Sequence, residues 1–132
     1  MTFAISLRAG LVALALSLGT AEVLAAAADY EFEPLEVDLT KGNGCELAVR
    51  LVHKPSGKPV AGAVLFRTRI DMGPDKMETM TAEHESVPSS EPGVYRFKAD
   101  LTMAGGWAFR VMAKVQGEKD TVEGVVVFKA KD

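Results

Sequence analysis

The segment Trp107-Ala-Phe-Arg-Val-Met-Ala-Lys-Val115 decides the fold class of this chain. Apolar side chains occupy every second position, from Trp107 to Val115. The positions between them carry one alanine, one methionine, one arginine and one lysine. This period of two is typical of a β-strand that turns one face to a core and the other to solvent. We therefore expect Trp107 to anchor the core, and Met112 to lie on the outward face.

Comparable alternation recurs on both sides of this strand. Turn signals such as Lys41-Gly-Asn-Gly44 and Gln116-Gly-Glu-Lys-Asp120 separate the segments. We predict seven strands within residues 35–39, 45–51, 60–72, 80–87, 94–101, 107–115 and 121–130. Short strands with frequent turns and no strong amphipathic helix indicate an all-β fold, an antiparallel β-sandwich of the immunoglobulin-like kind.

Two of these segments carry more detailed expectations. In the third, the positions expected to face the core are Val64, Phe66, Thr68 and Ile70, followed by Met72. The segment after it is ambiguous, because Met77, Met80 and His84 have the spacing of one helical face, whereas residues 80–87 also alternate as a strand does. We favour the strand, because two threonines and flanking proline-rich turns suit an all-β layout; either geometry puts Met80 and His84 on a common side.

Residues 1–28 have the organisation of a secretory signal peptide. Arg8 precedes an apolar run at residues 11–18, and small residues at 23–28 offer cleavage after Ala26 or Ala28. The run is too short for a spanning helix, which needs about 20 residues, although an uncleaved anchor is an alternative. We expect residues 29–132 to form one domain that is exported to the periplasm and has no membrane span.

Composition narrows the function classes. The net charge of −3 argues against nucleic acid as a partner, because phosphate binding needs a concentrated basic surface. The single Cys45 cannot form an internal disulfide, so we expect a buried, inert thiol. No catalytic serine, phosphate-binding or His-Glu-x-x-His motif is present, and we expect the protein not to be an enzyme.

Soft metal ligands concentrate between Ile70 and His84. Met72, Met77, Met80 and His84 surround the turn Gly73-Pro-Asp75. Thioether sulfur and neutral imidazole suit copper, and Cu(I) in particular. Methionine is also a flexible filler of apolar gaps and contact surfaces, so a metal-free interaction domain that docks a partner through a methionine-rich edge is the alternative.

Met103 extends this candidate site, because it lies in the turn before Trp107. In a sandwich the loops gather at the two ends, so we expect this turn to approach the turn after Met72. The nearby acids are expected to form a solvated rim that attracts a cation; they are Asp71, Asp75, Glu78, Glu83 and Glu85.

Four motifs in this order resemble the YtkA-like domain family, which is similar in style to FixH-like proteins and to copper-binding sandwiches of the CopC type. They are Gly57-Lys-Pro-Val60, Asp71-Met-Gly-Pro-Asp-Lys-Met-Glu-Thr-Met80, Glu91-Pro-Gly-Val-Tyr-Arg-Phe97 and Met103-Ala-Gly-Gly-Trp107. The resemblance runs from about Phe32 to Phe128.

The resemblance implies an exported immunoglobulin-like domain over residues 29–132. It also implies a role in heavy-metal efflux or in copper supply to respiratory oxidases, beside a membrane-bound efflux or oxidase-assembly protein. The site residues that it implies are Met72, Met77, Met80 and Met103.

Overall fold

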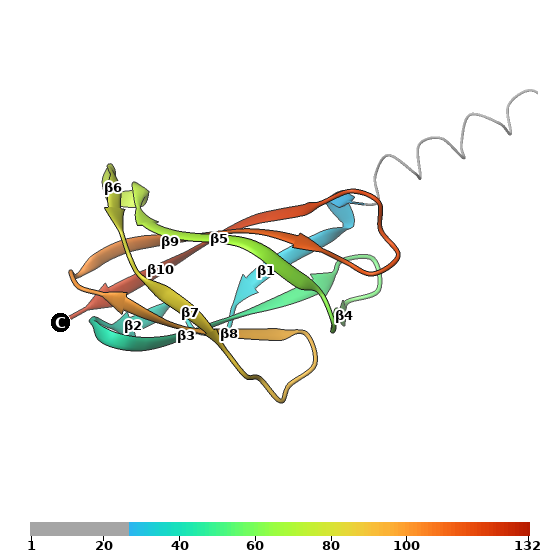
Figure 1. Ribbon diagram of the computed structural model, residues 1–132, viewed down its shortest axis with the longest axis horizontal. Coiled ribbons are helices and arrows are strands. Elements are labelled where there is room, and N and C mark those ends of the chain that lie inside the picture. The colour runs from blue at the N-terminus through green and yellow to red at the C-terminus, as the bar shows by residue number, and fades with distance from the viewer. Residues whose placement is uncertain (1–26) are drawn as a thin grey trace, which may run out of the picture.

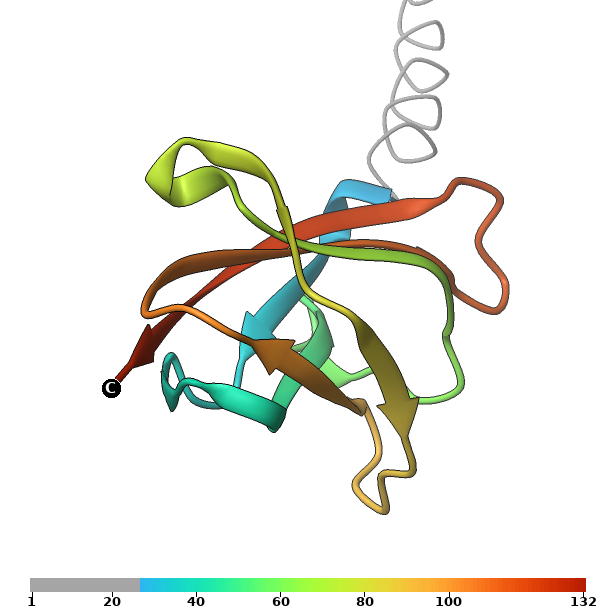
Figure 2. The same ribbon diagram turned by 60° about the vertical axis from the view of Figure 1, so that its left-hand side comes forward.

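The computed structural model describes residues 27–132, which form two β-sheets packed face to face (Figures 1 and 2). The predicted signal peptide lies outside these residues except for Ala27 and Ala28, which belong to the short 3-10 helix η2 (Ala27–Asp29). No helix in the described part is long and apolar enough to cross a membrane. The all-β prediction is confirmed.

The first sheet has the strand order β1-β3-β8-β7, and β4 also pairs with β3. Its strands are β1 (Tyr30–Pro34), β3 (Gly42–His53), β4 (Lys58–Pro59), β7 (His84–Val87) and β8 (Val94–Leu101). The second sheet has the order β2-β10-β9-β5-β6. Its strands are β2 (Asp38–Thr40), β5 (Val64–Met72), β6 (Met77–Thr81), β9 (Gly105–Lys114) and β10 (Val122–Lys131). Every pair is antiparallel except β2 with β10.

The core lies between the sheets, where the alternating apolar side chains meet. Trp107 of β9 is 1% exposed, and Phe109 beside it is fully buried, as predicted for this strand. Met112 points to the outward face and is half-buried. Burial of one face per strand thus explains why the period of two located these segments.

The prediction for residues 35–39 as one strand is wrong. The chain runs as β1 in the first sheet, crosses over, and continues as β2 in the second. Val37 lies at this crossing and is 42% exposed. Within the crossing, Leu35 donates to the carbonyl oxygen of Ala48 in β3, and Val37 accepts from the N–H of Lys129 in β10. Because the segment passes from one sheet to the other, its alternation does not follow a single buried face.

The predicted inward face of the third strand is wrong for Val64 and Phe66. They are 61% and 51% exposed, whereas Leu65 packs against the core. The register between β5 and β9 shifts between Leu65 and Arg67, which marks a β-bulge. A bulge inserts one residue and so reverses the phase of the strand, which returns Ile70 to the core.

The strand prediction after the Gly-Pro turn is confirmed, but the single strand divides between the two sheets. β6 pairs with β5 in the second sheet, and β7 pairs with β8 in the first. The buried Ala82 connects them, and its N–H donates to the carbonyl oxygen of Ile70 at 2.9 Å. Met80 and His84 therefore belong to different sheets. Met80 is exposed, whereas the His84 ring lies against the buried Phe97, so the expected common side is wrong.

Candidate functional site

The first methionine-bearing turn joins β5 to β6. Met72 ends β5, the 3-10 helix η3 (Gly73–Asp75) follows, and Met77 begins β6 directly opposite Met72. Lys76 closes the turn in the left-handed region at φ 62°, and its N–H donates to the carbonyl oxygen of Gly73 at 2.8 Å. This hairpin lies at the end of the sandwich that carries the C-terminus, away from η2 (Figure 1).

The second methionine-bearing turn, between β8 and β9, lies against the first. The N–H of Gly106 donates to Asp75 Oδ2 at 3.1 Å. A Cβ placed on Gly105 would lie 2.8 Å from Met72 Cε, so the Met72 methyl group rests on bare backbone. The expected approach of the two turns is therefore confirmed, and glycine is required at position 105 for this close packing.

The four methionines differ in exposure. Met72 is fully buried, Met77 is half-buried against the core, and Met80 and Met103 are 37% and 39% exposed. Met80 lies in the irregular part of β6, between the paired residues Met77 and Thr81, so strict alternation does not relate its side chain to that of Met77. The turns thus bring Met72, Met77 and the segment carrying Met103 to one end, and Met80 follows three residues farther along β6.

Indole hydrogen bonding orders the Met103 turn. Trp107 Nε1 donates to the carbonyl oxygen of Met103 at 3.1 Å. The ring that anchors the core therefore also holds the main chain of an exposed methionine. The bond involves only the backbone of Met103, whose side chain is exposed.

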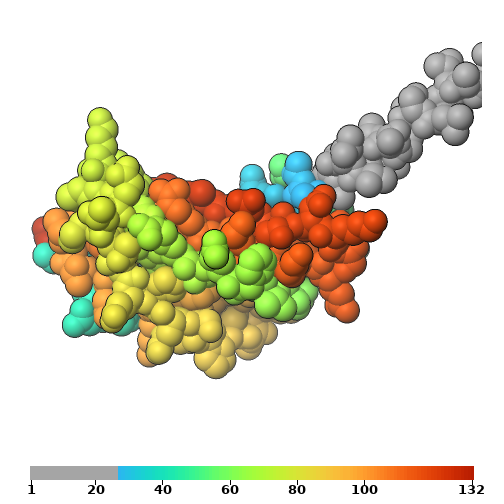
Figure 3. All heavy atoms as spheres, turned by 45° about the horizontal axis from the view of Figure 1, so that its top comes forward, coloured from blue at the N-terminus to red at the C-terminus, as the bar shows by residue number. Residues whose placement is uncertain are grey.

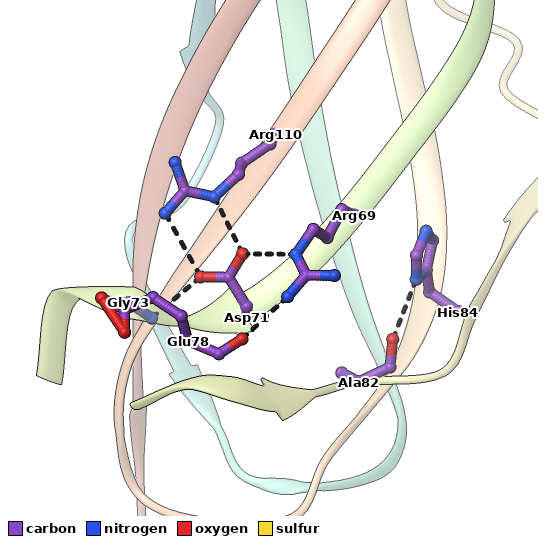
Figure 4. Close-up of polar contacts among 7 residues, drawn as sticks. All are labelled: Arg69, Asp71, Gly73, Glu78, Ala82, His84 and Arg110. Carbon is purple, nitrogen blue, oxygen red and sulfur yellow. Dashed lines mark hydrogen bonds and ion pairs between the residues drawn. The ribbon is translucent and has the colours of Figure 1, made fainter. Parts of the chain in front are cut away.

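Both ring nitrogens of His84 lie within hydrogen-bond distance of other groups. Nδ1 is 3.0 Å from the carbonyl oxygen of Ala82 (Figure 4), and Nε2 is 2.8 Å from Thr68 Oγ1. Because a carbonyl oxygen only accepts, Nδ1 carries the proton and Nε2 faces the hydroxyl group. Ligation of a metal by His84 would require one of these bonds to break.

Asp71 is the functional-site candidate whose environment the sequence did not predict. It was expected in a solvated rim, which is wrong, because its exposed fraction is 1%. Its carboxylate accepts hydrogen bonds from Arg110 Nε at 2.8 Å, Arg69 Nε at 3.0 Å and the N–H of Gly73 at 2.8 Å (Figure 4). The one signal in the sequence is Arg69, because it lies two residues before Asp71 and so on the same face of the strand, where it can pair with the carboxylate.

Hydrogen bonds from Arg110 are the main cause of an unusually low pKa at Asp71, about 2. The Gly73 N–H and Arg69 act in the same direction, and burial opposes them. The remaining acids of the predicted rim are exposed; they are Asp75, Glu78, Glu83 and Glu85.

Other ligand types do not gather near the turns. Within residues 27–132 no three His, Cys, Asp or Glu side chains are grouped so that they would hold a metal ion. Cys45 is a half-buried free thiol opposite Ala99, and burial raises its pKa.

Comparison with protein families finds a match to the YtkA-like family over residues 24–112. The chain belongs to the YtkA-like family. The matched span contains both methionine-bearing turns and ends within β9, so the resemblance predicted from the motifs is confirmed. No curated protein matches the chain.

Proposed function

We propose that this YtkA-like domain binds a soft metal ion, Cu(I), at the paired methionine turns and passes it to a membrane-bound efflux or oxidase-assembly protein. The observation that carries the proposal is the hydrogen bond from Gly106 to Asp75, because it holds the two turns together. Met77 and Met103 are the thioethers on these turns that are not fully buried. Thioethers are neutral and polarisable, so they favour Cu(I) over hard cations.

The surroundings of the turns suit a cation. Asp75 and Glu78 are exposed beside them, and the whole chain is acidic. Met80 and Met103 are exposed enough for sulfur to reach an incoming ion. Met72 is fully buried and packs against Gly105, so it supports the second turn from inside.

The location of this activity follows from residues 1–28. Their basic start, apolar run and small-residue end are typical of a secretory signal peptide, so we propose that the domain works in the periplasm. An intact-mass measurement of protein recovered from the periplasm tests this. A mass that retains Met1 would contradict the cleaved form.

Anaerobic titration with Cu(I) against a chromophoric chelator tests metal binding. We expect the natural chain to withdraw Cu(I) from the chelator and the double variant Met77→Leu/Met103→Leu to withdraw far less. Met112→Leu is the matched control, because Met112 lies on the outward face of β9. Leucine keeps volume and apolarity, so the fold should persist. Equal competition by the natural chain and the double variant would remove the site as proposed.

Single variants assign the remaining residues. In the same titration, Met72→Leu and Met80→Leu test whether either thioether binds Cu(I) together with Met77 and Met103. His84→Gln reports whether the ring exchanges a hydrogen bond for the metal. Because thioethers carry no proton to displace, binding through sulfur alone should change little with pH.

The second candidate is a metal-free domain that docks a membrane-bound partner through the same methionine edge. The exposure of Met80 and Met103 at 37% and 39% favours it, because adaptable thioether side chains suit contact surfaces. The two candidates differ in the titration above. A natural chain that fails to compete for Cu(I) would leave the docking role as the better explanation.

A further inference from the structure

The outward face of the second sheet carries a concentrated positive charge. Its basic side chains, at outward positions of β5, β9 and β10, are Arg67, Arg69, Arg110, Lys114, Lys129 and Lys131. The acidic side chains of the same face are Asp71, Glu123 and Asp38, which pairs with Lys129 and lies 3.4 Å from Lys131. Six basic and three acidic side chains leave a surplus of three positive charges on a chain whose net charge is −3. We call this surface the arginine face; Figure 3 views the molecule from this side.

A groove of about 430 Å³ runs across the arginine face between β5 and β10. The side chains that matter in its lining are Arg67, Arg69, Arg110, Met112, Glu123 and Val125. Val125 is 57% exposed, and Val127 farther along β10 is 44% exposed. Apolar side chains thus lie among cationic ones on a surface that belongs neither to the core nor to the methionine turns.

Asp71 holds two of the arginines in place. Arg69 donates from Nε to Asp71 and from Nη2 to the carbonyl oxygen of Glu78 at 2.8 Å, and Arg110 donates to Asp71 from Nε and Nη2 (Figure 4). In the contacts among residues 27–132, Nη1 of each guanidinium makes no hydrogen bond. These side chains are ordered before any ligand arrives, which lowers the entropic cost of binding.

We propose that the arginine face docks an acidic segment of a partner protein, with apolar side chains among its carboxylates. Arginine forks bind carboxylates in a bidentate manner, and the exposed valines and Met112 offer apolar contact between them. Arg67 and Arg69 are two residues apart in β5 and lie about 7 Å apart along the strand, the repeat at which an extended segment presents alternate side chains.

A protein segment suits this surface better than a plane of lipid headgroups does. The guanidinium groups line a groove, into which single carboxylates fit. The charge surplus and the apolar lining together favour an acidic peptide.

Fluorescence anisotropy with a labelled peptide of repeated Glu-Glu-Leu units tests the proposal, without metal and at low salt. We expect the natural chain to bind it, to ignore a Lys-Lys-Leu counterpart, and to bind more weakly as salt rises. Arg67→Glu/Lys114→Glu should weaken binding by about tenfold or more. The matched control is Lys54→Glu/Lys58→Glu, which makes the same charge change on exposed residues near β4 of the other sheet.

Each other outcome overturns the proposal. Absence of peptide binding would do so, and so would equal weakening in the two charge variants, which would mean a non-specific charge effect. Binding to phosphatidylglycerol vesicles without binding to the peptide would assign the face to a membrane surface instead. The Met77→Leu/Met103→Leu variant should bind the peptide normally, so failure of this proposal and failure of the copper proposal are distinguishable.

Discussion

Asp71 and Arg110 form a two-pronged ion pair across neighbouring strands, with 2.8 Å between Nε and Oδ2 and 3.3 Å between Nη2 and Oδ1. The carboxylate is buried, whereas the arginine side chain is 43% exposed. The pair therefore joins the interior of the hairpin to the arginine face. Four donated hydrogen bonds stabilise the charged form of Asp71 against the cost of burial.

This ion pair predicts how stability depends on pH. The pKa of Asp71 is lowered from 3.8 to about 2 in the folded chain, so its contribution is complete above about pH 4 and is lost as pH falls toward 2. We expect Asp71→Asn to lower the free energy of unfolding at pH 7 by roughly 1–3 kcal/mol. Urea denaturation at pH 7 and near pH 2 measures this, and the difference from the natural chain should shrink at the lower pH. Glu85→Gln is the exposed control, and a difference that stays constant with pH would contradict the assignment.

Gly105→Ala should destabilise the contact between the two methionine turns. Gly105 has φ +139°, and an added Cβ would clash first with Asp75 Oδ2 and then with Met72 Cε, which would lie at 2.8 Å. Strain and crowding together should cost roughly 1–3 kcal/mol in the free energy of unfolding. Gly117→Ala is the control, because its φ is +90° but no atom lies within 4 Å of an added Cβ. Chemical denaturation of both variants checks this, and equal losses would mean that the crowding is negligible.

Trp107→Ala should lower the free energy of unfolding by about 3–5 kcal/mol, the usual cost of truncating a large buried aromatic side chain. The same change removes the hydrogen bond to the Met103 carbonyl oxygen. Met112→Ala on the outward face of β9 should cost less than about 1 kcal/mol. Urea denaturation followed by far-ultraviolet circular dichroism measures both; a loss below 1 kcal/mol for Trp107→Ala would show that this ring does not anchor the core.

The bulge in β5 predicts opposite outcomes for two adjacent residues. Leu65→Ala should cost roughly 1–2 kcal/mol, because Leu65 packs against the core, whereas Phe66→Ala should change stability by less than about 0.5 kcal/mol. Thermal denaturation of the two variants measures the difference. If Phe66→Ala is the more damaging change, the strand has no bulge and the regular alternation holds.

The features that sequence alone determined are local. Alternation along residues 107–115 determined a strand with Trp107 inside, and turn residues determined where neighbouring strands end. The four motifs also determined membership of the YtkA-like family. These predictions succeeded because the period of a strand and the preferences of turn residues depend on a few neighbouring positions.

Tertiary structure decided how distant segments meet. Asp71 and Arg110 are 39 positions apart, and alternation put Asp71 on an outward face without revealing the arginines and the turn that bury it. The bulge beside Phe66 arises from the pairing of β5 with β9, and the contact between Met72 and Gly105 arises from the packing of two separate turns. Strand partners and registers are set by burial of whole sheet faces and by hydrogen bonding between distant strands, and these energies have no local pattern in the chain.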